Sequence, residues 1–433
     1  YVTYNCEGKQ RPIYVNVIGA PNTDASLLGV SSLIPSGNLS GTVQPIDFIL
    51  KNYGTQDIDS VKIQWDIDGD STRSLTWYGP LHSLDTAHIT AGSHIFGPGE
   101  HCINAIVTCT GDTYPSNDTM QDCMRFCFDK TPRTIGNSGY FANFTQAVNA
   151  LKSCGICDTV TLVALPGTYT EQINITGIPG LNSSSPIRFT SSTGNPDDVI
   201  IRFFPNAANN YVVKFDNVGD ITFEGITIAS DSSSYADALV IINSHDLTFT
   251  SDSIAVAGHI NSALASAISL DGNIQNLNFT GNATYGGYYA LSNVLGSGAM
   301  SNLNIFENRF RNFYEGGVSL QNIDNLNITH NIVRSSRTVN TSQIGIFVNN
   351  YDGDFDIQRN MVVLAGTGDG LKQGIKILSA RGTSEFPIRF YNNMISVYGG
   401  NANNTNTSAG LYIDNSRYIN IYYNTIQVKS GNN

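Results

Sequence analysis

Two aspartates and an arginine in the last third of the chain have types and spacing that could support chemistry. Asp354 and Asp356 flank Phe355, so both carboxylates leave one face of an extended segment if Phe355 points inward. The repeat described below places Arg389 directly over Asp356. A cation held by carboxylates beside a base is what cleavage of an acidic sugar polymer requires. The alternative is an exposed ion pair, which contributes ~0–1 kcal/mol.

A second acidic cluster occupies residues 66–70 and could hold a calcium ion. It departs from the EF-hand pattern, because Gly69 stands at the fourth loop position and Trp77 replaces the bidentate glutamate. Asp68-Gly69 after an alternating strand indicates a hairpin turn instead. Four histidines lack metal-binding spacing: His82, His88, His94 and His101. We therefore expect no metal and no cofactor, with Ca²⁺ at one of the two acidic clusters as the alternative.

All seven cysteines lie in the first half of the chain. Such clustering predicts disulfides in an oxidising compartment, with a redox or metal-binding Cys-x-x-Cys as the alternatives. We predict that Cys154 is joined to Cys157, and that Cys109 is joined to Cys123 because the two flank one loop. The sequence does not assign the pairing of Cys6, Cys102 and Cys127.

Glycosylation signals recur along the chain. The Asn-x-Ser/Thr pattern gives Asn278, Asn327, Asn340 and Asn406 as N-linked candidates. A second pattern, Asp followed by Ser or Thr and then by an apolar residue or Thr, gives Thr86, Thr119 and Ser253 as O-linked candidates. This second pattern is similar to the acceptor motif of Bacteroidetes O-glycosylation. The abundance of Asn, Ser and Thr produces many such matches by chance.

Charge is scarce in this sequence. Charged residues make up 13% of the chain and the net charge is −12, which disfavours a disordered polyelectrolyte and a nucleic-acid partner. No apolar run of about 18 residues occurs, so we expect no membrane insertion. The N-terminus lacks a signal-peptide pattern, and we interpret the sequence as a processed or excised piece.

A repeated phrase from about residue 215 onward defines the elements that position these residues. Each copy places two apolar residues around a polar one, as in Leu303-Asn304-Ile305, and a corner asparagine three residues later. A third strand precedes most copies. Three short strands per repeat predict a right-handed, three-sided parallel β-helix of roughly ten coils. The corner asparagines tolerate left-handed backbone angles and are expected to stack as a ladder: Asn282, Asn308, Asn331, Asn360, Asn393 and Asn424.

The segment just before the first coil predicts a short amphipathic helix. Phe144, Ala147, Val148 and Leu151 share one face, and Asn143 is a plausible N-cap. Such a helix would cover the open end of the solenoid core.

With the phrase Pro166-Gly167-Thr168-Tyr169-Thr170-Glu171 and the asparagine corners, residues 133–433 resemble the right-handed parallel β-helix proteins related to pectate lyases and to surface proteins of Bacteroidetes-type bacteria. That fold hosts lyases, hydrolases and adhesins. The resemblance implies that outward carboxylates could hold calcium and an outward basic residue could abstract a proton. The paired-aspartate patterns of pectin glycosidases are missing.

The front of the chain has a different pattern. Alternating strands at 8–12-residue spacing predict an antiparallel immunoglobulin-like β-sandwich. The phrase Lys51-Asn52-Tyr53-Gly54 resembles cell-adhesion-related immunoglobulin-like domains of bacterial surface proteins. We expect an all-β chain in three parts: 1–19, the end of a preceding segment or linker; 20–130, the sandwich; and 131–433, a β-helix that continues beyond the sequence given.

These patterns favour a non-catalytic structural or adhesive protein of the bacterial cell surface, within a glycosylated or filament-forming assembly. Its expected partners are further copies or other surface proteins, with a polysaccharide as the alternative. A β-helix polysaccharide lyase or glycoside hydrolase is the first alternative. A carbohydrate-binding module is the second, because outward aromatic residues could stack on sugars or contact another protein: Phe306, Tyr391, Tyr418 and Tyr422.

Overall fold

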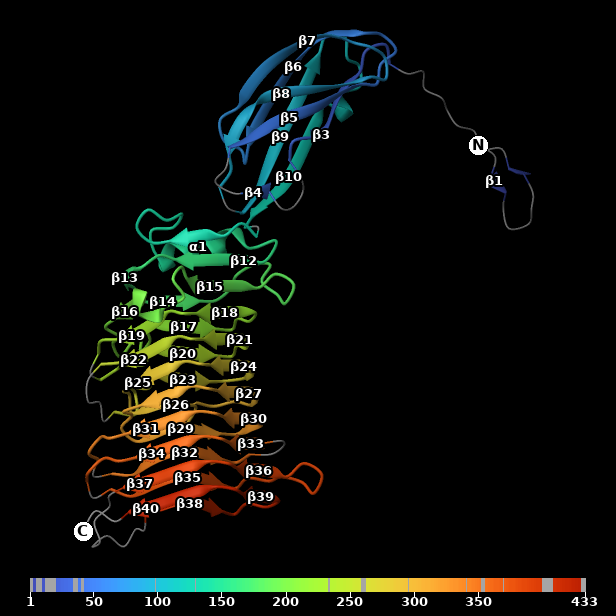
Figure 1. Ribbon diagram of the computed structural model, residues 1–433. Helices are drawn as coiled ribbons and strands as arrows, with labels where there is room; N and C mark the ends of the chain where they lie inside the picture. The colour runs from blue at the N-terminus through green and yellow to red at the C-terminus, as the bar shows by residue number, and fades with distance from the viewer. Residues whose placement is uncertain are drawn as a thin grey trace. The chain divides into compact units, whose positions relative to one another are not determined.

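The protein is described here from a computed structural model. The structure describes residues 3–4, 10–11, 21–33, 38–39, 43–97, 99–128, 130–232, 234–257, 262–294, 296–339, 341–351, 355–368, 370–398 and 408–429. The chain divides into two compact units, Tyr1–Cys127 and Phe128–Asn433, and each is described by itself (Figure 1). No helix among the described residues is long and apolar enough to cross a bilayer.

The first unit is the predicted β-sandwich. One sheet is β3 (Ala25–Val30), β5 (Val43–Asn52) and β8 (Thr86–Ile95); the other is β4 (Asn38–Leu39), β10 (Thr119–Cys127), β9 (Gly99–Cys109), β6 (Ile58–Ile67) and β7 (Arg73–Leu81). The turn helix η1 (Pro115–Asn117) precedes β10, and β1 (Thr3–Tyr4) pairs with β2 (Gln10–Arg11). Strands β5 and β6 bury alternate residues, so Phe48 and Trp65 meet edge to face with ring centroids 5.7 Å apart.

The disulfide in the sandwich differs from the predicted Cys109–Cys123 pair. Cys123 is bonded to Cys102, its direct neighbour across β9 and β10, with Cα atoms 4.0 Å apart. Cys109 lies an odd number of residues after Cys102 in β9, so its side chain leaves the opposite face of the sheet. That face packs against the sandwich core, and the Cys109 thiol is half-buried there.

Peptide mapping without reduction is expected to recover Cys102 linked to Cys123, and alkylation after unfolding is expected to label Cys109. Because the bridge closes a loop across a separation of 21 residues, its reduction should lower the free energy of unfolding of the sandwich by about 3 kcal/mol. A peptide that links Cys109 to Cys123 would contradict this assignment.

The second unit is the predicted three-sided parallel β-helix. The first sheet contains β11 (Arg133–Ile135), β12 (Val160–Ala164), β15 (Ile187–Ser191), β18 (Ile221–Glu224), β21 (His245–Thr250), β24 (Ile274–Thr280), β27 (Met300–Phe306), β30 (Ile323–Thr329), β33 (Phe355–Gln358), β36 (Ile388–Tyr391) and β39 (Ile419–Tyr422). The second contains β13 (Gly167–Thr170), β16 (Val199–Phe203), β19 (Thr227–Ser230), β22 (Ser253–Val256), β25 (Ala283–Tyr285), β28 (Arg309–Arg311), β31 (Ile332–Ser335), β34 (Met361–Leu364), β37 (Met394–Tyr398) and β40 (Thr425–Lys429). The third contains β14 (Ile173–Ile175), β17 (Val213–Asp216), β20 (Leu239–Ile242), β23 (Ile268–Asp271), β26 (Tyr289–Ser292), β29 (Gly316–Gln321), β32 (Gln343–Asn349), β35 (Lys372–Leu378) and β38 (Ala409–Asp414). The turn helix η2 (Pro196–Asp198) precedes β16.

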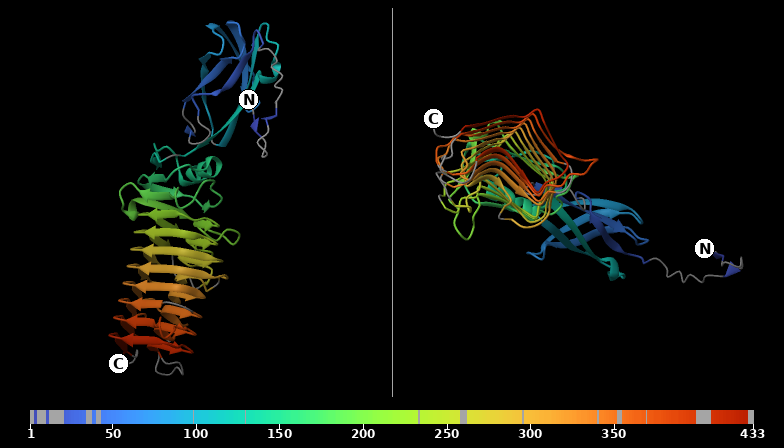
Figure 2. Two further views of the ribbon diagram at one scale, coloured as in Figure 1. Left: turned by 90° about the vertical axis from the view of Figure 1, so that its right-hand side faces the viewer. Right: turned by 90° about the horizontal axis from the view of Figure 1, so that it is seen from below.

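Strand register is constant along the β-helix although coil length varies. Leu277, Leu303 and Leu326 lie directly over one another in the first sheet, and all three are buried. Phe249 and Phe279 stack inside the helix with ring centroids 5.1 Å apart. Additional residues are accommodated in the turns, so the coils keep one bent outline when viewed along the stack (Figure 2). The predicted inward column of apolar residues is therefore the core of the unit.

Helix α1 (Phe144–Cys154) covers the core at the first coils, as predicted. The Asn143 side chain caps it by accepting from the Gln146 backbone N–H at 2.9 Å, and Glu171 accepts from the first two backbone N–H groups of α1. Its apolar stripe continues to Cys154, which carries a buried thiol, while Cys157 is disulfide-bonded. The predicted Cys154–Cys157 bridge is therefore wrong, because the helix turns Cys154 into the core.

Candidate functional site

The corner between the first and second sheets is the predicted asparagine ladder. Each amide oxygen from Asn308 onward accepts from the backbone N–H and the side-chain amide of the preceding member. The Asn308 backbone N, for example, lies 2.8 Å from Asn331 Oδ1, and the Asn331 backbone N lies 3.0 Å from Asn360 Oδ1. Asn331 Nδ2 also donates to the Ile305 carbonyl at 2.8 Å. The amides from Asn282 to Asn393 are buried, that of Asn424 is half-buried, and together they hold neighbouring coils in register.

The left-handed backbone angle at this corner belongs to the residue before each ladder asparagine. These residues have φ between +54° and +68°: Gly281, Glu307, His330, Arg359, Asn392 and Tyr423. Among the described residues, the ladder asparagines themselves have no positive φ. Asparagine is needed here for its two-sided amide, which bonds to the coil on either side, and not for backbone tolerance as the sequence suggested.

A shallow groove of about 600 Å³ runs over the outer face of the first sheet. It is lined by Asn276, Asn278, Asn302, Leu303, Asn304, Asn325, Leu326, Asn327, Phe355, Asp356 and Arg389. Its amides bond to one another from coil to coil. Asn325 Nδ2 donates to Asn302 Oδ1 at 3.0 Å, Asn302 Nδ2 to Asn276 Oδ1 at 2.8 Å, and Asn327 Nδ2 to Asn304 Oδ1 at 2.7 Å. This second, exposed ladder gives the groove a neutral surface.

Sequence reasoning missed this second ladder. A signal was present, because an asparagine precedes the first apolar residue in the phrases Asn276-Leu277, Asn302-Leu303 and Asn325-Leu326. These three asparagines have φ between +53° and +57°, so the position also requires a residue that accepts a left-handed backbone.

Asp356 and Arg389 meet at one end of the groove in the predicted register. Arg389 Nε lies 2.6 Å from Asp356 Oδ1 and Nη2 lies 3.0 Å from Oδ2, so the pair is bidentate. Both carboxylate oxygens are thus occupied by the guanidinium. A guanidinium stays protonated at physiological pH and cannot act as a base without a strong perturbation. Asp354, the third predicted member, lies outside the described residues.

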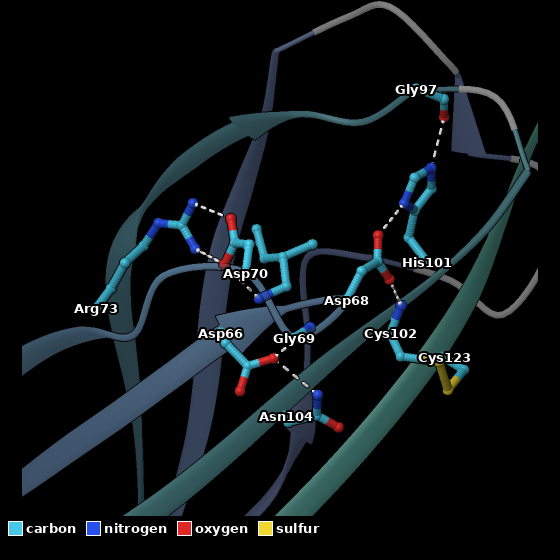
Figure 3. Close-up of polar contacts among 11 residues, drawn as sticks. Asp66, Asp68, Gly69, Asp70, Arg73, Gly97, His101, Cys102, Asn104 and Cys123 are labelled. Atoms are coloured by element: carbon cyan, nitrogen blue, oxygen red, sulfur yellow. Dashed lines mark hydrogen bonds and ion pairs between the residues drawn. A yellow bond between two sulfur atoms is a disulfide. The ribbon is translucent and has the colours of Figure 1, made fainter.

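The acidic cluster of the sandwich forms a turn whose carboxylates are bound by protein donors (Figure 3). Asp66 Oδ1 accepts from the Gly69 backbone N–H at 2.8 Å, and the pKa of Asp70 is lowered by the hydrogen-bonded Arg73 guanidinium. Partial burial raises the pKa of Asp68, but the backbone N–H of Cys102 and the His101 ring outweigh it and hold that pKa below its ordinary value. Asp68 and Gly69 both have positive φ, as a tight hairpin requires.

One group of potential metal ligands occurs among the described residues, and two of its three members form a disulfide. Glu100, Cys102 and Cys123 have donor atoms close together. The two sulfurs form the disulfide and therefore cannot bind a cation as thiolates.

The glycosylation candidates fall at contrasting places. Thr86 and Thr119 are exposed on sandwich strands, and Ser253 is half-buried in β22. Asn278 and Asn327 line the groove, where the amide nitrogen of Asn327 already donates to Asn304. Asn340 and Asn406 lie outside the described residues.

Two of the outward aromatic residues are stacked. The rings of Tyr391 and Tyr422 lie 5.0 Å apart and 10° from parallel. Tyr418 is exposed. Phe306 contacts the His330 ring edge to face. The aromatic groups thus form two separate pairs and not one continuous row.

No protein-family model matches the chain, and no curated protein is significantly similar to it in sequence. Among solved structures, pectin methylesterase PemA from Erwinia chrysanthemi is 11% identical over 69% of this chain and 93% of its own, with a TM-score of 0.35. PfbA, a surface adhesin of Streptococcus pneumoniae, is 12% identical over 62% of this chain and 84% of its own, with a TM-score of 0.30. A CARDB domain from Pyrococcus furiosus, described in complex with di-metal ions, is 17% identical over 24% of this chain and 92% of its own, with a TM-score of 0.20. At these identities the likeness is one of fold.

Proposed function

We propose that the chain is a non-catalytic, extracellular structural and adhesive protein of the bacterial surface. The observation that carries this proposal is the groove on the first sheet. Its amides bond to one another, and Asp356 and Arg389 are bonded to each other. Among the described residues that line the groove, no side chain is left poised to exchange a proton with a substrate. The disulfides support an oxidising, extracellular location.

The assembly is part of the same proposal. The exposed tyrosines at Tyr418 and Tyr422 give a surface suited to contact with further copies or with other surface proteins. A glycosylated or filament-forming assembly is consistent with the exposed acceptor candidates Thr86 and Thr119.

A polysaccharide lyase is the competing function, and Asp356 beside Arg389 in the groove is the observation that favours it. We expect no unsaturated product when the purified chain is incubated with polygalacturonate or alginate and calcium. An Asp356→Ala variant should give the same null result. Turnover by the wild-type chain that is lost in the variant would overturn the structural proposal.

A further inference from the structure

Three arginines project from the outer face of the second sheet on two adjacent coils. Arg309 and Arg311 belong to β28 and Arg334 belongs to β31, and all three are exposed. Arg311 and Arg334 are direct neighbours in the parallel register, a separation of ~4.8 Å between strands. The other residues of the two strands that alternate with them point into the core.

These arginines are not ion-paired in the described part of the chain, in contrast to Arg188 and Arg202, which are also exposed on the β-helix. Arg188 pairs with Glu224, and Arg202 pairs with Asp231 at 2.7 Å. Like charges directly opposite on neighbouring strands repel and destabilise a sheet. Three unpaired cations side by side in a chain of net charge −12 are therefore not explained by stability.

Two of these arginines, Arg311 and Arg334, line a groove together with apolar and uncharged polar side chains. About 530 Å³ is enclosed by Arg311, Asn312, Ile332, Arg334, Ser336, Met361 and Val363. Tyr285 lies directly beside Arg311 in the register and is 53% exposed. The site therefore combines guanidinium groups with an apolar floor and an exposed aromatic ring. This groove lies on a different sheet from the asparagine-lined groove.

This combination fits one class of ligand. A guanidinium binds a carboxylate or sulfate through two parallel hydrogen bonds. An apolar floor and a tyrosine ring suit the C–H face of a sugar, and aromatic side chains pack well against such surfaces. A nucleic acid fits poorly, because the negative charge of the whole chain repels its backbone and three cations neutralise few phosphates.

We propose that this groove, at Arg311 and Arg334, binds an acidic polysaccharide. The proposal deepens the adhesive role by giving it a ligand class, but it does not require that role. A protein that cleaved polysaccharide at another site could still bind a polysaccharide in this groove.

The test is affinity electrophoresis of the full chain in gels that contain polygalacturonate, dextran sulfate, or neutral dextran. We expect retardation by one or both of the acidic polymers, weakened by added salt, and none by dextran. The two acidic arms distinguish a carboxylated from a sulfated ligand. The Arg311→Gln/Arg334→Gln variant should bind at least about tenfold more weakly, because two charge-assisted pairs are lost. Arg202→Gln is the matched control on the same sheet, and it should bind like the wild type.

Thermal unfolding separates a binding defect from a folding defect. Because the substitutions remove a like-charge contact, the double variant should unfold at the same temperature as the wild type or higher. The single variants Arg311→Gln and Arg334→Gln supply intermediate affinities if the double variant folds poorly. Equal retardation of wild type and variants, or no retardation by either acidic polymer, would overturn the proposal. Cleavage of polygalacturonate, with the retardation of wild type and variants still as expected, would instead overturn the proposed function.

Discussion

An Asn331→Ala variant is expected to lose about 3–6 kcal/mol of unfolding free energy, because each buried polar group left without a partner costs ~1–3 kcal/mol. The Asn331 amide accepts from the backbone N–H of Asn308 and donates to the carbonyl of Ile305 and to Asn360 Oδ1. All of these groups are buried, so water cannot replace the lost partner without entering the corner. The loss should be local to the coils on either side.

The measurement is urea unfolding followed by far-ultraviolet circular dichroism. Tryptophan fluorescence would be the wrong probe, since both tryptophans, Trp65 and Trp77, lie in the sandwich. Asn304→Ala is the matched control, because it removes a half-buried amide from the outer face of the first sheet at the cost of one hydrogen bond to Asn327. We expect that control to cost less than about 1 kcal/mol. Equal losses in the two variants would show that the corner ladder is not a principal source of stability.

The second large effect concerns Asp252, which occupies the first rung of the corner ladder. Its backbone N–H donates to Asn282 Oδ1 at 2.8 Å, and its own Oδ1 accepts from the Ile226 backbone N–H at 2.8 Å. Burial raises the pKa of Asp252 well above its ordinary value, and the charge of Glu224 adds to the rise. Its Oδ2 has no hydrogen-bond partner in the described residues. In Asn282, the next member of the ladder, the equivalent position is held by Nδ2, which donates to the Phe249 carbonyl. A carboxyl group whose charged form is disfavoured by burial therefore takes the place of an amide.

Because the folded-state pKa of Asp252 is raised, its contribution to stability is complete below about pH 4, the unfolded pKa. It is lost progressively as the pH rises toward the folded pKa, by ~1.4 kcal/mol per pH unit in that interval. An Asp252→Asn variant should therefore be more stable than the wild type at pH 8, with a smaller difference near pH 4. Urea midpoints at pH 4, 6 and 8 measure this.

Two other aspartates control the interpretation of this pH series. Burial raises the pKa of Asp237 to about 7, so Asp252→Asn should keep a residual decline between about pH 4 and pH 7. The pKa of Asp246 is instead lowered by its hydrogen bond to His245, so Asp246→Asn should leave the alkaline decline unchanged. If the urea midpoints of the wild type and the Asp252→Asn variant change identically with pH, ionisation of Asp252 does not lower the free energy of unfolding.

The β-helix was predictable because its pattern repeats. Leu303 and Leu326 could be aligned by sequence alone, and the same alignment placed Arg389 over Asp356. The cysteines were less predictable, since pairing depends on which face of β9 each residue leaves and on the register with β10. That register depends on the whole sandwich and not on the loop between Cys109 and Cys123.

Grooves were the least predictable feature. The arginines Arg311 and Arg334 are separated along the chain by a full coil, and only the register of β28 and β31 brings them together. Asp252 also escaped notice in the sequence, because an aspartate in a column of asparagines is informative only once its burial is known.

The constant register of coils with different lengths has a mechanical consequence. Neighbouring coils meet through hydrogen-bonded seams, so a pulling force applied at one end opens a single seam at a time and leaves the rest intact. Leu303 and Leu326 are 23 residues apart, and Phe355 and Ile388 are 33 apart. At ~3.3–3.6 Å per residue, each peeled coil releases roughly 75–120 Å of slack chain. Under tension the β-helix should therefore lengthen in steps of unequal size, one coil at a time.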